Sequence, residues 1–251
     1  MAEGILAAIP DKSLVIMAEK VSARAAELKR KYDVSVVSDL KEVAGCASMI
    51  FLAVKPQDVD AVAAEVKALL KPTQTIVSIV AGKTIAKLRK AFGAKVKIVR
   101  VMPNLALRAN AGMCAVCGAK GVSKITVGKV ARILGSAGES VVLEERDFDA
   151  VTALSGSGPA YFAYMEEAMM EGGIKLGLKP AVARLLAEQT MYGTAKYLRE
   201  SGADLGEFIA GVCTKGGTTA AGMEKLSDSS FKSIVADTLA AAGKRSKELA
   251  G

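Results

Sequence analysis

Short runs of β-branched and apolar residues alternate with helical patterns from Ser13 to Glu145. The runs cover residues 14–17, 34–37, 48–54, 75–80 and 97–103. The segments between them place apolar residues at helical spacing. Strands joined through helices run parallel, and strands that are apolar on both faces need helices on both sides of their sheet. The alternation therefore predicts an α/β domain built on a parallel sheet.

The strand pattern stops near Arg146. One further strand (112–119), one helix (124–134) and a last strand (140–145) complete the first part, and from Phe148 onward every segment is helical. The helical part is broken only by turns rich in glycine, serine and proline. The sequence therefore predicts two domains, residues 1–146 and 147–251.

Composition limits the class of ligand. The net charge is +8, but basic residues are interspersed with acidic ones, and aromatic residues make up only 4% of the chain. Little is available to stack on bases, so we expect small anions and no nucleic acid as ligands. No apolar run approaches the ~20 residues that a membrane span needs. The first residues lack the basic segment of a secretion signal, so a cytoplasmic protein is expected.

The chain has four cysteines and no histidine. Cys114 and Cys117 have zinc-like spacing, but a second pair or a histidine is missing. They also lie in a predicted strand, where an odd offset sends two side chains to opposite faces. We expect no metal site, and structural or incidental cysteines.

Two predicted parallel strands end in sequences that suit a ligand site. Val54-Lys55-Pro56 joins a buried strand to a helix, and Met102 to Asn104 ends another strand on the same rim. Ligands of α/β sheets bind beyond the carboxyl ends of the strands. Ordinary strand-to-helix turns would explain both segments equally well.

Two glycine-rich turns mark the helical part. One is LSGSGPAY, residues 154–161, and the other is CTKGGTT, residues 213–219. Both expose successive backbone N–H groups ahead of a helix, where the positive helix end favours an anion. Close helix packing is the alternative for the first turn. The second is no phosphate loop, because a P-loop needs G-x-x-x-x-G-K-[ST] between a strand and a helix, so a small carboxylate is the better ligand.

Taken together, these stretches resemble the pyrroline-5-carboxylate reductase family, which carries out the last step of proline biosynthesis. The resemblance covers essentially the whole chain: FLAVKPQ, SIVAGKTIAKL, VRVMPN, ALSGSGPAYF, GIKLGLKPAVARLLAEQT, KGGTT and KRSKEL. It implies a Rossmann-type domain followed by an all-α dimerisation domain, with the active site formed in a homodimer or a higher homo-oligomer built of dimers. The implied substrate is a cyclic imino acid, whose C=N carbon receives a hydride from NAD(P)H. Such chemistry suits a chain without histidine, because no proton is taken from carbon.

The resemblance also implies roles for individual residues. The backbone of Gly216, Gly217 and Thr218 would hold the substrate carboxylate, and the catalytic Thr219 hydroxyl would bond the ring nitrogen. Three residues of the first turn, Ser155, Gly156 and Ser157, would also contact the substrate. The cofactor would be lined by Ala53, Val54, Lys55, Pro56, Ala81, Gly82, Met102, Pro103 and Asn104.

The choice of cofactor depends on the turn after residues 14–17. Lys20, Ser22 and Arg24 suit the 2′-phosphate of NADPH, whereas Glu19 suits the ribose hydroxyl of NADH. The alternative is that these residues only form a solvent-exposed helix start and bind no cofactor. We expect NADPH to be preferred, with NADH as the alternative.

The family's first strand and its G-x-G-N-M-A turn are missing, and residues 1–8 already have a helical pattern. That strand would lie centrally in the sheet, so its loss would cost on the order of 10 kcal/mol. We expect that the sequence as given simply starts after this strand and turn, because the motifs further along the chain are intact. A decayed cofactor site is the other interpretation. Milder departures are Thr214-Lys215 and Leu105-Ala106, where the family has Ser-Pro and Thr-Pro.

Two other functions stay open. A β-hydroxyacid dehydrogenase needs a lysine on a helix of the second domain. Lys175 and Lys196 are available, but neither lies in a G-x-x-x-K-x-x-x-N context. The other is a non-catalytic oligomeric relative with a crippled cofactor site, which only the missing N-terminal motif favours.

Overall fold

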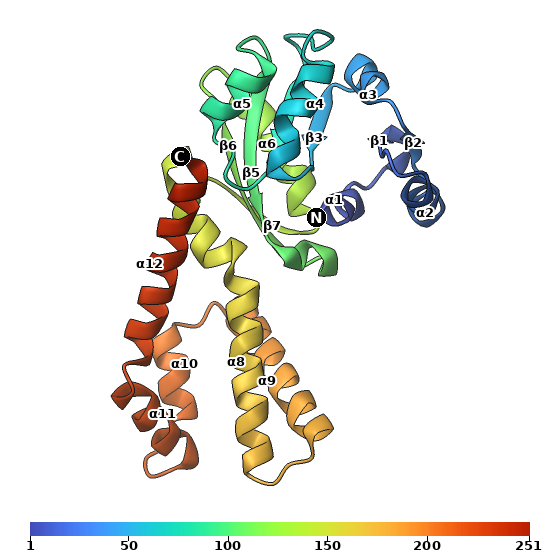
Figure 1. Cartoon of the computed structure of the whole chain (residues 1–251). Coiled ribbons are helices and arrows are strands. Elements are labelled where there is room, and N and C mark those ends of the chain that lie inside the picture. Colours follow the sequence, from blue (N-terminus) through green and yellow to red (C-terminus); the bar gives the residue numbers. More distant parts are fainter. The chain divides into compact units, whose positions relative to one another are not determined.

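The computed structural model describes residues 1–251, apart from the side chain of Ala8. It consists of two compact units (Figure 1). Unit 1 comprises Met1–Ser157 and Ala242–Gly251, and unit 2 comprises Gly158–Ala241. The helical last segment of the chain thus returns to unit 1.

Unit 1 holds two sheets. A parallel pair is formed by β1 (Ile16–Ala18) and β2 (Ser35–Val37). The second sheet has the order β3-β4-β5-β6-β7, with β3 (Met49–Leu52), β4 (Thr75–Ser78), β5 (Lys97–Pro103), β6 (Gly112–Gly118) and β7 (Gly138–Val142). The α-helices of unit 1 are α1 (Ala2–Ala8), α2 (Ser22–Tyr32), α3 (Leu40–Cys46), α4 (Val59–Val66), α5 (Ile85–Phe92), α6 (Lys124–Gly135) and α7 (Phe148–Val151), together with the end of α12 (Phe231–Ala250).

The strands predicted from the alternation all form, and β3, β4 and β5 are parallel as expected. The Rossmann-like class of this part is therefore confirmed. One feature was not predicted. β6 runs antiparallel to β5, because the connection between them, residues 104–111, is shorter than the dozen or so residues that a parallel crossover needs. β1 and β3 belong to separate sheets, which agrees with the expectation that the family's first strand, normally between these two strands, is missing.

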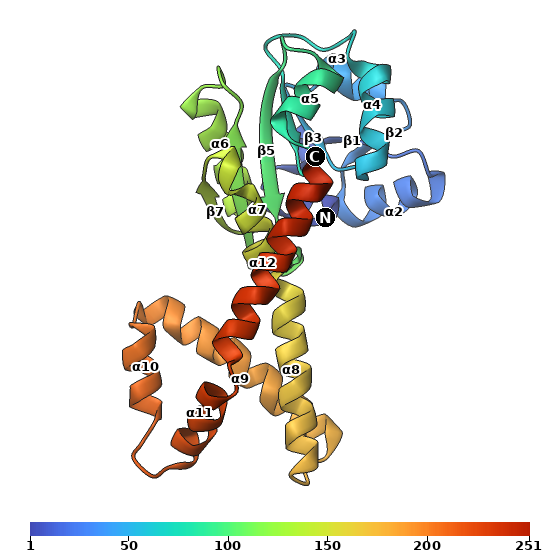
Figure 2. The same cartoon turned by 60° about the vertical axis from the view of Figure 1, so that its left-hand side comes forward.

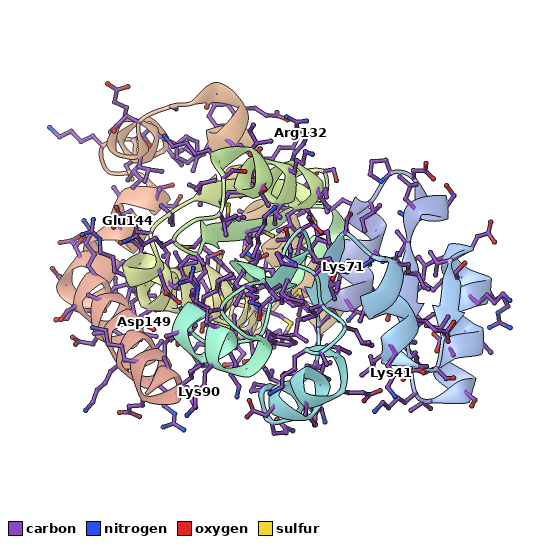
Figure 3. The ribbon with its side chains drawn as sticks, turned by 90° about the horizontal axis from the view of Figure 1, so that it is seen from above. Lys41, Lys71, Lys90, Arg132, Glu144 and Asp149 are labelled. Carbon is purple, nitrogen blue, oxygen red and sulfur yellow. The ribbon has the colours of Figure 1, made fainter. Side chains whose placement is uncertain are left out.

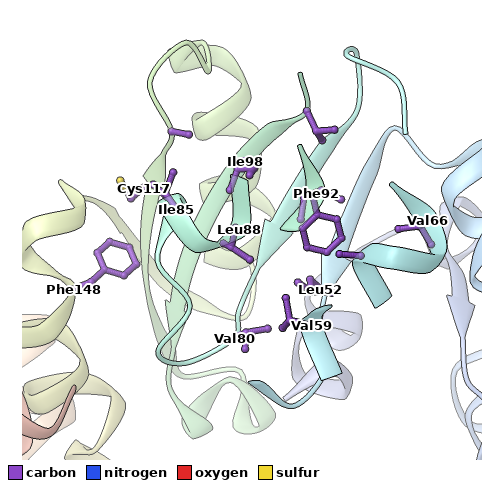
Figure 4. Close-up of a cluster of buried hydrophobic side chains, with 14 of the residues drawn as sticks. Leu52, Val59, Val66, Val80, Ile85, Leu88, Phe92, Ile98, Cys117 and Phe148 are labelled. Atoms are coloured by element: carbon purple, nitrogen blue, oxygen red, sulfur yellow. The ribbon is translucent and has the colours of Figure 1, made fainter. Parts of the chain in front are cut away.

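The larger sheet is covered on both faces. Figure 4 shows one apolar cluster, in which Leu88 and Phe92 of α5 and Val59 of α4 pack on the sheet. The opposite face is covered mainly by α6, which lies on the side of β5 away from α5 (Figure 2) and whose Val130 and Leu134 are fully buried. Ile5 of α1 belongs to the same cluster. Successive residues of each central strand alternate between the two clusters, as the period of two requires.

The two cysteines of β6 lie on opposite faces, as their odd spacing predicts. Cys114 belongs to the α6 cluster and Cys117 to the α5 cluster. Burial raises the pKa of the Cys114 thiol to about 11, so this side chain is held as a neutral thiol. Among the residues that the structure describes, no group of three or more His, Cys, Asp or Glu side chains could hold a metal ion.

Charged side chains lie at the periphery. Lys41, Lys90 and Arg132 project outward from three different helices (Figure 3). By contrast, Arg100 of β5 is buried, with Nη1 donating to Oε1 of Glu145 at 3.0 Å and its guanidinium 4.7 Å from the Phe148 ring centroid. Phe148 is itself fully buried, so α7 is tied into the core of unit 1.

Unit 2 is entirely helical, as predicted. It contains α8 (Gly158–Lys175), α9 (Pro180–Ser201), α10 (Leu205–Val212), α11 (Thr218–Asp228) and most of α12 (Phe231–Ala250). Large apolar side chains lie exposed on these helices, among them Phe162 (66% exposed) and Tyr164 (74%) of α8. In the part of the chain that the structure describes, no helix combines the length and apolarity needed to cross a membrane.

The two units divide between Ser157 and Gly158, further along the chain than the switch from strands to helices. The reason is that α7 and the turn after it pack on the sheet, and that Ser246 of α12 donates to Asp149 Oδ1 at 2.6 Å. The division into domains 1–146 and 147–251 stays a prediction about function.

Candidate functional site

Three parallel strands, β3, β4 and β5, end at the same edge of the larger sheet. The loops beyond them line a cavity of about 320 Å³. Its lining consists of Met1, Ala53, Val54, Pro56, Ile79, Val80, Ala81, Met102, Pro103, Asn104, Leu105 and Gly156. It therefore brings together most of the residues predicted to bind the cofactor with one from the predicted substrate set.

Four lining residues were not among the predicted ones: Met1, Ile79, Val80 and Leu105. The last three directly adjoin the predicted segments, so the ends of the strands were available as a signal. Conversely, Lys55 is exposed and does not line the cavity. Pro56 begins a short 3₁₀ helix (Pro56–Asp58) at its first position, as predicted, where a missing N–H costs nothing.

Asn104 is fixed from two sides. Its side-chain Oδ1 accepts a hydrogen bond from the Met113 backbone N–H at 3.1 Å. Its backbone N–H donates to the Met113 carbonyl, also at 3.1 Å. Nδ2 of the same amide lies 3.5 Å from Oγ of Ser155. The pairing with β6 thus holds a polar side chain at the cavity, and places the MPN segment next to the LSGSG turn.

The first three residues of LSGSG belong to a π-helix, Thr152–Gly156, and the Ser157 N–H donates to the Thr152 carbonyl at 2.9 Å. Single π turns occur frequently at functional sites. A Cβ at Gly156 would lie 2.5 Å from Cε of Met102, so any larger residue there requires the end of the Met102 side chain to move. Of the three predicted substrate residues in this turn, Gly156 lines the cavity, whereas Ser155 and Ser157 do not.

Gly82, which is predicted to line the cofactor, lies against the end of α12. It has a φ of +70°, and a Cβ there would lie 3.1 Å from the carbonyl oxygen of Leu249 in α12. The left-handed backbone and the close approach both require glycine. Gly82 thus packs against the end of α12, while its neighbour Ala81 lines the cavity.

The turn between β1 and α2 carries the residues predicted to meet a 2′-phosphate. Ser22 begins α2, whose N-cap residue makes no side-chain cap, so amide N–H groups are available there. Lys20 is exposed and pairs loosely with Glu65 at 3.5 Å. Glu19, the residue that favoured NADH, uses Oε1 to accept the Val21 N–H at 2.9 Å. That carboxylate is therefore occupied in shaping the turn.

Arg24 is paired with acidic residues. Its guanidinium contacts Glu27 at 2.6 Å and also contacts Glu3 of α1. Glu3 accepts further hydrogen bonds from Tyr32 and Lys31, at 2.7 and 3.0 Å. The Tyr32 hydroxyl, Lys31 and Arg24 lower the pKa of Glu3 to about 2. Arg24 would share its guanidinium between these carboxylates and a phosphate.

The KGGTT turn lies in unit 2. Gly216 has a φ of +72°, and Gly217 is the N-cap of α11, with its N–H bonded to the Thr214 carbonyl at 2.9 Å. No side chain caps α11, which leaves its first amides available. Thr218 is exposed and Thr219 is half-buried in the first turn. This arrangement is a helix N-terminus that can accept a small anion.

Comparison with protein families and curated proteins gives matches over both units. Residues 145–249 match the family model described as pyrroline-5-carboxylate reductase dimerisation, and residues 1–82 match the one described as NADP oxidoreductase, coenzyme F420-dependent. A pyrroline-5-carboxylate reductase from Synechocystis is 37% identical over 254 residues, covering 99% of this chain and 94% of the relative. One from Aquifex aeolicus is 35% identical, covering 95% and 88%.

Solved structures agree with these matches. The structure of a pyrroline-5-carboxylate reductase from Coxiella burnetii has a TM-score of 0.95 at 28% identity, covering 100% of this chain and 95% of that one. The crystal structure of the Plasmodium falciparum enzyme with NADP bound has a TM-score of 0.86 at 29% identity, covering 100% and 93%. The likeness thus extends over the whole length of the chain.

Proposed function

This chain belongs to the pyrroline-5-carboxylate reductase family, and we propose that it reduces 1-pyrroline-5-carboxylate to L-proline with NADPH, the last step of proline biosynthesis. The observation that supports this most directly is the cavity at the carboxyl edge of β3, β4 and β5. Ligands of α/β sheets bind at this edge. The cavity gathers Ala53, Val54 and Pro56, Ala81 and the MPN segment, all of which were selected from the sequence.

The cavity fits the nicotinamide end of the cofactor. Its walls are mostly apolar, and the crowding of Gly156 against Met102 makes them tight, while the fixed amide of Asn104 provides polar groups. When bound, NADPH supplies the hydride for the imine carbon. We propose that its binding residues are Ala53, Val54, Lys55, Pro56, Ala81, Gly82, Met102, Pro103 and Asn104. Lys20, Ser22 and Arg24 would meet the 2′-phosphate.

The substrate would be held by unit 2. The backbone of Gly216, Gly217 and Thr218 at the start of α11 would hold the substrate carboxylate, because the positive helix end adds to the amide hydrogen bonds. The Gly217 N–H, which donates to the Thr214 carbonyl at 2.9 Å, would exchange that bond for the carboxylate. The Thr219 hydroxyl would accept a hydrogen bond from the protonated ring nitrogen and so orient the imine. Ser155, Gly156 and Ser157 of unit 1 are likewise proposed to contact the substrate.

We also assign residues 1–146 to cofactor binding, and 147–251 to substrate binding and dimerisation. The exposed apolar side chains of α8 support assembly, since contiguous apolar surface usually marks an interface. A homodimer, or a higher oligomer built of dimers, in the cytoplasm is the proposed state. Light scattering of the purified chain tests the assembly, and a monomeric mass at micromolar concentration would exclude it.

The mechanism is tested with Thr219→Val. Removing the hydroxyl is expected to cost about 1–3 kcal/mol of transition-state stabilisation, which is a loss of roughly 5- to 150-fold in kcat/KM for pyrroline-5-carboxylate. Thr218→Val is the matched control, because only its backbone amide has a proposed role. NADPH oxidation is measured with pyrroline-5-carboxylate and, separately, with a hydroxyacid semialdehyde.

The outcomes separate the candidate functions. Oxidation of NADPH by the imine alone, with a selective loss in Thr219→Val, supports the proposal. Turnover of the semialdehyde would indicate the β-hydroxyacid class instead. Equal kinetics in both threonine variants would remove Thr219 from catalysis, and failure of saturating NADPH to raise the melting temperature would indicate a non-catalytic protein.

A further inference from the structure

A second cavity of unit 1, of about 820 Å³, has no lining residue in common with the candidate cofactor cavity. It lies between the first turns of α5 and α6 and the ends of β6 and β7. Small-molecule sites usually occupy about 300–1,000 Å³. The size and position of this cavity therefore suit a ligand other than the nicotinamide cofactor.

The wall of the cavity is largely apolar. Ile85 and Cys117 lie side by side at the margin of the core cluster (Figure 4), and Val122, Val127 and Leu143 continue the wall. Gly128 of α6 also lines it, and a Cβ built there would meet no atom within 4 Å. An apolar molecular body can thus be accommodated.

Among the described charged residues that line the cavity, the acidic ones have ion-pair partners and the two lysines do not. The acidic residues are already engaged, because Glu145 pairs with Arg100 and accepts the Ile85 N–H at 2.7 Å, while Glu144 pairs with Arg146 at 3.0 Å. Lys120 and Lys124 have no such partner among the described residues. Positive charge is therefore left over at the cavity.

Arg89 adds a further unsatisfied donor. Its Nη2 donates to the Lys120 carbonyl at 2.5 Å, but its Nε is buried without a hydrogen-bond partner. A buried donor left unpaired is unfavourable, and a guanidinium binds carboxylates with two N–H groups at once. A carboxylate in the cavity could draw the side chain inward and satisfy Nε.

We propose that this cavity binds a small carboxylic acid with an apolar body, held by Arg89 with Lys120 and Lys124. The site is independent of the proposed reductase activity. Its test uses the whole 251-residue chain, with and without saturating NADPH, titrated with 4-(trifluoromethyl)benzoate and followed by ¹⁹F NMR. The expected Kd lies at or below about 1 mM, and the neutral 4-(trifluoromethyl)benzamide is expected to bind at least tenfold more weakly.

Variants locate the site. Arg89→Gln is expected to weaken binding of the acid about tenfold, and Gly128→Phe to abolish it by filling the cavity. Lys124→Gln, which leaves the contact between Arg89 and Lys120 intact, should weaken binding about threefold. Lys90→Gln is the control, since Lys90 is an exposed cation on the same helix that does not line the cavity.

Thermal melting confirms that each variant is folded before it is titrated. Four results would overturn the proposal: no binding at 5 mM acid (about five times the expected Kd), binding of the acid that is lost when NADPH is present, equal binding of the amide, or unchanged binding in folded Gly128→Phe. Binding that is lost in Gly128→Phe and weakened in Lys124→Gln supports it even if Arg89→Gln fails to fold.

Discussion

Gly156→Ala is expected to weaken NADPH binding about tenfold while leaving the free energy of unfolding nearly unchanged. Gly156 lines the candidate cofactor cavity, and a Cβ there would lie 2.5 Å from Cε of Met102. Ordinary contacts between carbon atoms are about 3.5–4.0 Å, so the methyl group of Met102 must move by about 1 Å or more.

The effect on stability is small because two terms oppose each other. Forcing the flexible Met102 side chain off its rotamer costs about 0.5–1.5 kcal/mol. Alanine in a helical backbone recovers about 0.5–1 kcal/mol relative to glycine, and Gly156 has no left-handed φ that would forbid it. The free energy of unfolding should change by less than about 1 kcal/mol.

The effect on NADPH binding is larger, because the displaced methyl group of Met102 moves into the cavity that the cofactor is proposed to occupy. One misplaced methyl group in an apolar pocket costs about 1–3 kcal/mol of ligand binding. Fluorescence titration with NADPH measures Kd, and urea unfolding measures stability. Gly45→Ala in α3 is the matched control, since a Cβ there meets no atom within 4 Å. An unchanged Kd in Gly156→Ala, or an equal loss in Gly45→Ala, would refute the placement of Met102 at the cofactor.

Two further predictions concern charged groups of unit 1. Glu145→Gln leaves the buried guanidinium of Arg100 without its counter-charge, and should lower the free energy of unfolding by about 2 kcal/mol, less than a fully buried pair because Glu145 is 33% exposed. A shift of the urea midpoint that corresponds to under about 0.5 kcal/mol would contradict this. Glu3, whose pKa is lowered to about 2 chiefly by Tyr32, stabilises the fold above its ordinary pKa of 4.5, and this contribution is lost as the pH falls toward 2. Glu3→Gln should therefore show a flatter loss of stability between about pH 5 and pH 2, and curves that run parallel to the wild type would argue against the cluster.

Local patterns predicted most of the elements. The 3.6-residue and two-residue periods located the helices and strands, and the odd spacing of Cys114 and Cys117 placed them on opposite faces. Pro56 was correctly expected at the first helical position. These features depend on neighbours within one element, which is the information that a single sequence contains.

Pairings between distant residues could not be predicted in the same way. The positive charge of Arg24 suggested a phosphate ligand, but the sequence does not show that α1 brings Glu3 to it. Similarly, Arg100 lies in the strand that ends in the MPN segment, with no local sign that Glu145 and Phe148 would bury it. The direction of β6, by contrast, was predictable from the short connection that precedes it.

The division of the sheet limits how much of β1 and β3 is buried. Residues 14–17 and 48–54 are as apolar as residues 75–80, and all three were expected to be covered on both faces. The four residues of β4 are fully buried, whereas β1 and most of β3 are only half-buried, because each pairs on one side only. An apolar run shows how much side-chain surface a strand is able to bury. The number of neighbouring strands that pair with it decides how much of that surface is buried in the fold. The tight packing of unit 1 is therefore concentrated around β4 and β5, whose ends also form the cavity.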